Sequence, residues 1–270
     1  MINKLIFFGG GNMAEAIFAG LATNQHYHII VIQRNNEKAD KLKLKYPKIV
    51  IKPTLDFSPD INDLVFLAIK PQQAKQALVP LKNLLNKCTL ISVMAGLSSD
   101  TIANWLDNNK IIRTMPNTPS SIAKGVTAIY PSNSVTQESI ALCNNIFTNI
   151  GTIYLAKEES EIDKIAPFSS SSIAFTYYFI EGFIKSAEEQ FGFDKQEATK
   201  FITNSFIGAC DLLLNDSSIG IEEQRSRVTS KKGMTEQGIL TFEKYELHKI
   251  INEVAKNCYN RAIEMSTEFK

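Results

Sequence analysis

The chain has 270 residues and a formal net charge of +1, with 44% hydrophobic and 21% charged residues. This mixture is typical of a globular protein with one large domain or two ordinary ones, and it excludes a disordered chain. A charge near zero argues against a large nucleic-acid surface, and no apolar run reaches the ~18–20 residues that span a bilayer. The first residues lead directly into an apolar strand, so we expect no signal peptide and a cytoplasmic protein.

Up to about residue 155, short apolar runs alternate with helical patterns. The expected strands are 5–8, 29–32, 63–69, 89–93, 110–113, 125–130 and 152–155. Helices are expected at 12–22, 37–45 and 137–149. The strand runs are continuous rather than alternating, which is typical of strands covered on both faces, and strands separated by helices predict a parallel sheet.

The second half has a different pattern. Apolar residues recur at helical spacing over 161–190, 198–214 and 247–265, while 217–238 is polar and predicts a loop or short helices. We therefore expect an α/β domain over 1–158 and an all-helical domain over 159–270. Helices this apolar in a small domain often pack against another subunit, so a homodimer is expected.

A glycine-rich turn directly follows the first expected strand and opens the first expected helix. Gly9, Gly10, Gly11, Asn12, Met13 and Ala14 fit the pattern G-x-G-x-x-A. The first glycine allows the tight turn, the second lets a pyrophosphate approach the backbone, and Ala14 lets the helix pack close to the sheet. The helix N-terminus offers free N–H groups to phosphates, so the turn predicts a dinucleotide site in a Rossmann-type, doubly wound, mostly parallel sheet.

The end of the second strand indicates which dinucleotide binds. A site for NAD usually has an acidic residue there for the ribose 2′-hydroxyl. This chain has Gln33 and Arg34 instead, and the first acid is Glu37, inside the next helix. Arg34 suits a 2′-phosphate, so NADPH is expected, with NADH as the alternative.

Three later strand ends also carry residues suited to a ligand. Ala68, Ile69, Lys70 and Pro71 follow one strand, Ala95 and Gly96 follow the next, and the block from Met115 to Pro119 follows a third. Ligands in open α/β sheets bind beyond the carboxyl ends of the strands. The residues expected to line the cofactor site are Phe8, Gly9, Gly10, Gly11, Asn12, Met13, Gln33, Arg34, Ala68, Ile69, Lys70, Pro71, Ala95, Gly96 and Asn117.

These motifs resemble those of pyrroline-5-carboxylate reductases. The resemblance rests on Gly9 to Ala14, on Ala68 to Pro71, on Ala95-Gly96 and on Met115 to Pro119. In the second half, Val228-Thr229-Ser230 followed by Gly233 and Thr235 matches the substrate loop of that family. The resemblance runs through nearly the whole chain.

The resemblance implies hydride transfer from NADPH to the C=N carbon of 1-pyrroline-5-carboxylate, which yields L-proline. It implies that Ser230, Gly233, Met234 and Thr235 bind the substrate and that the Thr235 hydroxyl donates to the ring nitrogen. From its position alone, Thr235 also suits a helix N-cap. The family forms dimers with interlaced helical domains, often assembled into larger rings.

Two segments depart from the family pattern. Where S-G-S-G-P-A-Y is usual, this chain has Ser169 to Phe175 with both glycines replaced by serine, so close backbone approach there must be relaxed. Where S-P-G-G-x-T is usual, Lys231 and Lys232 replace the proline and the first glycine. The lysines add positive charge near a carboxylate site and are expected to shift substrate affinity.

Two other functions fit parts of the sequence. A dehydrogenase of 3-hydroxy acids would use a lysine and an asparagine one helical turn apart, and Lys200 and Asn204 have that spacing. A non-catalytic, regulatory NADPH-binding relative would keep the glycine turn and lose the chemistry.

The histidines and cysteines give no sign of a metal site. His26, His28 and His248 have no ligand partner at suitable spacing, so no metal is expected. Cys88, Cys143, Cys210 and Cys258 are far apart in sequence, and we expect reduced, mostly buried thiols.

Overall fold

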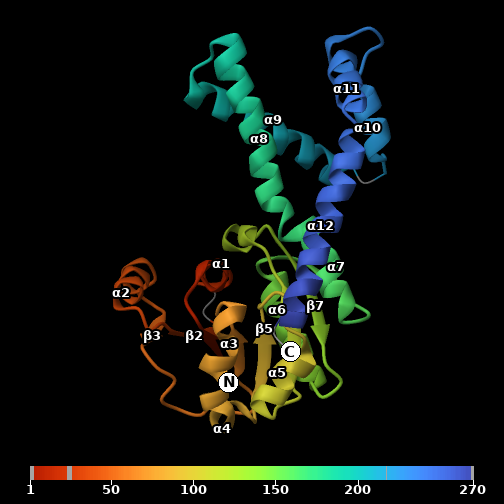
Figure 1. Cartoon of the computed structure of the whole chain (residues 1–270). Coiled ribbons are helices and arrows are strands. Elements are labelled where there is room, and N and C mark those ends of the chain that lie inside the picture. The colour runs from red at the N-terminus through yellow and green to blue at the C-terminus, as the bar shows by residue number, and fades with distance from the viewer. Residues whose placement is uncertain (1–2, 23–25, 217, 269–270) are drawn as a thin grey trace. The chain divides into compact units, whose positions relative to one another are not determined.

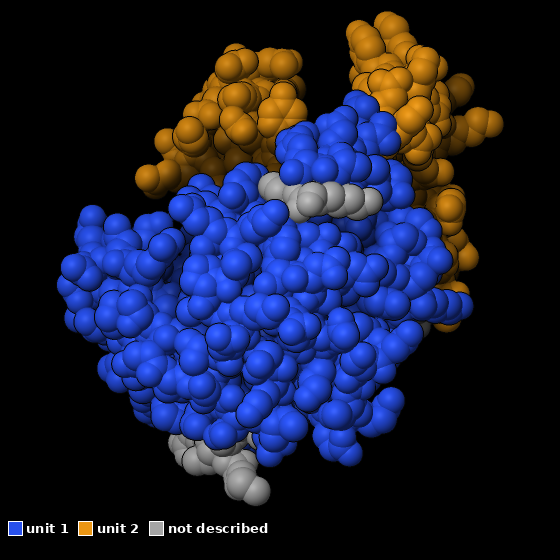
Figure 2. Space-filling view, turned by 60° about the horizontal axis from the view of Figure 1, so that its bottom comes forward, with its two compact units in different colours: residues 1–172, 257–270 blue, residues 173–256 orange. Residues whose placement is uncertain are grey.

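The computed structural model describes residues 3–22, 26–216 and 218–268. The predicted polar segment begins at residue 217, which lies outside the described residues, as do the ends of both predicted domains at 1–2 and 269–270. The chain divides into two compact units, residues 1–172 with 257–270 and residues 173–256, which Figure 2 shows in blue and orange.

The first unit is built on a sheet of eight strands among the described residues (Figure 1). The strands are β1 (Asn3–Phe8), β2 (Tyr27–Ile32), β3 (Val50–Lys52), β4 (Leu64–Leu67), β5 (Thr89–Ser92), β6 (Ile111–Met115), β7 (Gly125–Pro131) and β8 (Gly151–Leu155). Their spatial order is β3-β2-β1-β4-β5-β6-β7-β8. Only the β6–β7 pair among these is antiparallel. The predicted mostly parallel, doubly wound sheet is confirmed.

Helices cover both faces of this sheet. They are α1 (Asn12–Leu21), α2 (Asn36–Lys45), α3 (Pro71–Leu78), η1 (Val79–Leu81), α4 (Lys82–Leu85), α5 (Ser99–Leu106), η2 (Thr118–Ile122), α6 (Gln137–Thr148) and α7 (Ser160–Ser169). Alternate residues of β1 point to opposite faces: Leu5 and Phe7 join a core with α1 and α6, whereas Ile6 joins a core with α3, α4 and α5. Burial on both faces explains the continuous apolar strand runs.

The second unit is helical. Its elements are α8 (Ser172–Phe191), α9 (Lys195–Asn215), α10 (Ile221–Arg227), α11 (Met234–Lys244) and the first part of α12 (Leu247–Glu268). The expected helical stretch 161–190 is two helices, α7 and α8, and the expected polar segment 217–238 contains α10 and the beginning of α11, which continues to Lys244.

The first compact unit extends beyond the domain boundary expected at 158. Ile162 and Ala166 of α7 are buried against Met115 and Ala128 of the sheet, so α7 packs with the sheet. The end of α12 from residue 257 belongs to the same unit. A helix that follows the last strand in sequence is thus part of the sheet domain because its apolar face has its partners there.

Candidate active site

The carboxyl ends of β2, β1 and β4 meet at one level of the sheet. Phe8 is paired with Ile32 on one side and with Leu67 on the other. The chain leaves β1 toward β2 and later crosses to β4, so the spatial order reverses between β1 and β4. Ligands of open α/β sheets bind at such a switch point. The residues that follow these strands therefore lie at the same edge of the sheet.

Backbone hydrogen bonds fix the glycine turn at this edge. The Gly9 N–H donates to the Ile32 carbonyl at 3.1 Å, and the Ala68 N–H donates to the Phe8 carbonyl at 3.0 Å. Gly9 has φ +111°, and a Cβ there would collide with the Ala68 carbonyl oxygen. Only glycine satisfies both conditions, so Gly9 makes the turn that the sequence predicts.

The next two glycines differ in what surrounds them. A Cβ on Gly10 would lie 3.0 Å from the side chains of both Gln33 and Leu42, so packing restricts this position. A Cβ on Gly11 would meet no atom within 4 Å, and Gly11 is exposed. The open space above Gly11 is where the prediction places the pyrophosphate.

The N-terminus of α1 has unused donors beside this space. Gly11 is the N-cap and has no side chain to bond the first turn, and the first amide with an intrahelical partner is that of Glu15, which donates to Gly11. Among the described residues nothing accepts from the amides of Asn12, Met13 and Ala14. Free amides at a helix N-terminus favour an anion such as a phosphate.

The one acid in this turn is neutralised within the fold. The Glu15 carboxylate accepts from the Lys45 ammonium at 2.7 Å and from the Tyr46 hydroxyl at 3.1 Å. The hydrogen bond to Glu15 raises the pKa of Lys45 above its ordinary value. The paired carboxylate therefore opposes an incoming phosphate less than a free one would.

Arg34 stands exposed just after β2. Its neighbour Gln33 accepts from the Asn35 amide at 3.0 Å, and Asn35 in turn caps α2 by accepting from the Lys38 amide at 2.9 Å. Within the described part of the chain, no hydrogen bond or ion pair engages the Arg34 guanidinium. Its loop is fixed while its charge is free, which suits recognition of a 2′-phosphate.

The residues after β4 and β5 are mostly small or apolar. Ala68 and Ile69 are half-buried, and Lys70 is exposed as the N-cap of α3, which Pro71 opens. Ala95 packs beside Met115 and Ala128 in a small apolar cluster.

Gly96 is a second position where only glycine fits. It has φ +73°, and a Cβ there would lie 2.8 Å from the Cβ of Met265 near the end of α12. The turn after β5 is therefore packed tightly against the C-terminal turns of the chain.

Asn117, expected at the cofactor, has a structural side chain. Its Nδ2 donates to the Ser169 carbonyl at 3.0 Å, and its Oδ1 accepts from the Val126 amide at 2.8 Å. The residue is 3% exposed. The side chain thus joins the end of β6 to β7 and α7, and only the backbone of Asn117 remains to face a ligand.

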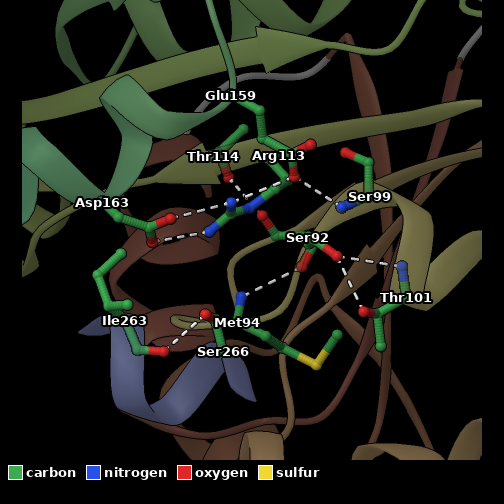
Figure 3. Close-up of polar contacts among 11 residues, drawn as sticks. Ser92, Met94, Ser99, Thr101, Arg113, Thr114, Glu159, Asp163, Ile263 and Ser266 are labelled. Atoms are coloured by element: carbon green, nitrogen blue, oxygen red, sulfur yellow. Dashed lines mark hydrogen bonds and ion pairs between the residues drawn. The ribbon is translucent and has the colours of Figure 1, made fainter. Parts of the chain in front are cut away.

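Arg113 lies at the centre of a buried ion-pair network that was not predicted from the sequence (Figure 3). The guanidinium bonds both oxygens of Asp163, at 2.9 and 3.3 Å, and Glu159 at 3.2 Å. Glu159 also accepts from the Ser99 amide at 2.7 Å. The Arg113 side chain is 4% exposed, so this network is an anchor of β6 to α5 and α7 and is not available to a ligand. The charge of Arg113 directly after the apolar pair Ile111-Ile112 of an expected buried strand was the signal that could have identified it.

The serine run that replaces the family glycines is hydrogen-bonded into the first unit. The Ser170 hydroxyl donates to the Pro116 carbonyl at 3.0 Å, and the Ser172 hydroxyl donates to the Phe168 carbonyl at 2.9 Å. The Ser171 hydroxyl accepts from the Cys258 thiol at 3.1 Å. The serine side chains therefore have structural partners of their own.

The expected substrate loop lies in the second unit, where it forms a tight turn before α11. The Gly233 amide donates to the Ser230 carbonyl at 2.9 Å, and Lys232 between them has φ +60°. A Cβ on Gly233 would collide with the Ser230 hydroxyl and would lie 2.9 Å from the Ser230 carbonyl oxygen, so packing restricts this position. The Lys232 amide donates to the Glu236 carboxylate at 2.6 Å.

Thr235 is not the N-cap of this helix. Gly233 is the N-cap and α11 begins at Met234, so Thr235 is the second helical residue. Met234 is 94% exposed and Thr235 is exposed. Among the described residues, the Thr235 hydroxyl and the amides of Met234 and Thr235 have no hydrogen-bond partner. The loop therefore presents free donors to solvent.

The motif of the rival dehydrogenase has a local explanation. Asn204 donates from its Nδ2 to the carbonyl of Lys200 at 2.7 Å, and both residues lie exposed on α9. The bond is the ordinary contact of a polar side chain with the preceding helical turn. This arrangement does not set the pair apart as a catalytic site.

The four cysteines are all free and differ in exposure. Cys88 and Cys143 are buried, but Cys258 is half-buried and Cys210 is exposed on α9, so the expectation of mostly buried thiols holds for two of the four. Among the described residues, no group of three His, Cys, Asp or Glu could hold a metal ion. None of the helices described combines the length and apolar content that crossing a bilayer requires.

Two protein-family models match the chain. Residues 159–265 match the model described as pyrroline-5-carboxylate reductase dimerisation, and residues 4–96 match that described as NADP oxidoreductase, coenzyme F420-dependent. The first contains the Ser230–Thr235 loop, and the second contains the glycine turn and Arg34.

Curated and solved relatives agree with these matches. The chain is 30% identical to a pyrroline-5-carboxylate reductase of Staphylococcus aureus (strain COL), with 97% of this chain and 98% of the relative covered. A solved pyrroline-5-carboxylate reductase from Coxiella burnetii is 31% identical with a TM-score of 0.84, covering 98% of this chain and 99% of the other. The solved pyrroline carboxylate reductase of Plasmodium falciparum with NADP bound shares the fold at 20% identity, with a TM-score of 0.85 and 98% of each chain covered. The chain belongs to the pyrroline-5-carboxylate reductase family.

Proposed function

We propose that this protein reduces 1-pyrroline-5-carboxylate to L-proline with NADPH. The proposal rests on two features that this member of the family combines. One is the open glycine turn at the switch point, and the other is the loop before α11 with its free hydrogen-bond donors. The first suits a dinucleotide, and the second suits a small carboxylate.

The residues of the first unit fit NADPH. Gly11 leaves open space where a Cβ would otherwise stand, and the free amides of α1 border that space. Arg34 offers an unpaired charge for the 2′-phosphate, and Ala68, Ile69 and Pro71 supply apolar surface at the same edge. When bound, NADPH supplies the hydride.

The loop before α11 binds the substrate. The amides of Met234 and Thr235 hold the carboxylate, and the Thr235 hydroxyl donates a hydrogen bond to the ring nitrogen. As the hydride forms a C–H bond with the imine carbon, the C=N π electrons move to nitrogen, which takes up one proton. The products are L-proline and NADP⁺, so electrons and protons balance.

We propose that the active form is a homodimer, with larger rings of dimers as a further assembly. The helical half matches a dimerisation model, and its helices carry large apolar side chains that are 40–80% exposed in the single chain. Those on α8 and α9 include Phe175, Tyr177, Tyr178, Phe183, Leu212 and Leu214. Apolar surface of this extent is typical of a subunit interface. Light scattering coupled to size exclusion measures the mass directly; a monomer at micromolar concentration would contradict this part of the proposal.

A cytoplasmic location completes the proposal. Its support is the set of free cysteines, which fits a reducing compartment. Fractionation of cells that express the tagged protein tests it.

The test of the activity is a spectroscopic assay of NADPH with 1-pyrroline-5-carboxylate. We expect turnover by the wild type, a loss of about 10²–10⁴-fold in Thr235→Ala, and recovery of part of the rate in Thr235→Ser, which keeps the hydroxyl. Wild-type protein that binds NADPH but does not turn over would favour the non-catalytic relative. Oxidation of a 3-hydroxy acid with NADP⁺ in place of this activity would favour the rival dehydrogenase.

A further inference from the structure

The loop before α11 carries two lysines whose charges are free. Lys231 and Lys232 are exposed, and no carboxylate of the described residues forms an ion pair with either ammonium group. Glu236, the acid nearest in sequence, bonds the backbone amide of Lys232 at 2.6 Å. On the neighbouring α10, Arg227 is already paired with Glu223 at 2.8 Å.

The positions of these lysines place their charge beside the loop's free amides. Lys231 and Lys232 are the two central residues of the turn that the Gly233–Ser230 hydrogen bond closes. The free amides of Met234 and Thr235 begin one residue after that turn. The charges at this turn are therefore two exposed ammonium groups, the positive end of the α11 dipole, and the Glu236 carboxylate that bonds the Lys232 amide, so the three side chains together carry a net charge of +1.

We propose that Lys231 and Lys232 make this enzyme select cyclic imines that carry a carboxylate over neutral ones, by long-range attraction added to the hydrogen bonds of the loop. The inference rests on the proposed function, in which this loop holds the substrate carboxylate. The attraction acts on the substrate as it arrives and while it is bound, and the ring itself contributes nothing to it. The lysines are specificity-determining residues and take no part in the proton transfer.

The size of the effect follows from Coulomb's law. In a solvent-exposed site, an ammonium ~4–6 Å from a carboxylate changes binding by roughly three- to five-fold. Removing both lysines is expected to lower kcat/KM for 1-pyrroline-5-carboxylate by about ten-fold at low ionic strength. In 1 M salt the Debye length falls to about 3 Å, and most of the difference should disappear.

The variants must remove charge without disturbing the turn. Lys232 has φ +60°, a conformation that asparagine tolerates better than most residues, so Lys232→Asn keeps the backbone and removes the charge. Lys231→Gln does the same at the neighbouring position. The control pair, Lys195→Gln with Lys256→Gln, removes two exposed positive charges from α9 and α12.

The experiment measures kcat/KM of the full-length enzyme with NADPH for two substrates, 1-pyrroline-5-carboxylate and 1-pyrroline, which has the same ring and no carboxylate. For the loop double variant we expect the ten-fold loss with the carboxylate substrate, a flattened salt dependence, and less than a two-fold change with 1-pyrroline. The control pair should match the wild type on both substrates.

Each other result overturns the inference in a recognisable way. An unchanged salt dependence in the loop variant, or equal losses on both substrates, would show that the lysines act through the structure of the loop or not at all, while wild-type turnover leaves the proposed function intact. A wild type that reduces neither imine would remove the proposed function and this inference together.

Discussion

Replacing Gly11 by alanine should separate cofactor binding from folding. A Cβ at this position meets no atom within 4 Å, and the backbone there has φ −81°, which alanine adopts without strain. Alanine is a poorer N-cap than glycine, but it also loses less entropy on folding, and the two effects nearly cancel. We expect the free energy of unfolding to change by no more than about 0.5 kcal/mol.

The effect on NADPH should be much larger, because the new methyl group occupies the open space that borders the free amides of α1. Each hydrogen bond from an amide to a charged phosphate contributes about 1.5–3 kcal/mol. Loss of two such bonds corresponds to about 3–6 kcal/mol, which weakens NADPH binding by at least about 100-fold.

The assay is NADPH binding by fluorescence titration beside thermal unfolding of the same sample. Gly9→Ala provides the contrast. Gly9 has φ +111°, and a Cβ there would collide with the Ala68 carbonyl, so this substitution should lower the free energy of unfolding. That cost is about 2–5 kcal/mol, and the melting temperature should fall by at least about 5 °C. If Gly11→Ala bound NADPH as tightly as the wild type, the phosphates would not lie over Gly11 and the reasoning would be refuted.

Three further changes test other parts of the account. Arg34→Ala should weaken NADPH binding by about 10- to 100-fold and leave NADH binding nearly unchanged, and equal losses for both cofactors would show that Arg34 does not bind the 2′-phosphate. Asp163→Asn should lower the free energy of unfolding by about 2–3 kcal/mol in denaturant titrations. The loss is smaller than for a buried arginine left without any carboxylate, because Glu159 still bonds Arg113. An unchanged stability would contradict the anchoring role. Burial raises the pKa of Cys88 to about 12 and raises that of Cys143 above its ordinary value, so at pH 8 both remain protonated in the folded state and should react with a thiol reagent only after denaturation. Rapid reaction of either thiol in the native protein would show that its part of the core opens.

The sheet and its glycine turn could be predicted because the sequence signals there are local. Uninterrupted apolar runs identified seven of the strands, and the turn from Gly9 to Ala14 follows from the conformation that glycine allows. The short strand β3 has three residues, none of them fully buried, and gave no such signal. Helices α3 and α5, of eight residues each, are too short for a clear periodic pattern.

The roles of individual polar residues depended on contacts far apart in sequence. Asn117 was predicted at the cofactor site from its place after a strand, and the bonds of its side chain to Ser169 and Val126 could not be foreseen from that place. Arg113 forms ion pairs with residues 46 and 50 positions away, which no local pattern indicates. Thr235 looked like an N-cap because a helix follows it, whereas the glycine two residues earlier takes that position.

The most direct test of the central claim is to follow the transferred hydrogen itself. Enzyme, 1-pyrroline-5-carboxylate and NADPH deuterated at the nicotinamide C4 position would be incubated, and the product analysed by mass spectrometry and NMR. The account predicts L-proline with one deuterium at C5, the former imine carbon. Proline without deuterium at that carbon, or oxidation of NADPH without formation of proline, would contradict it.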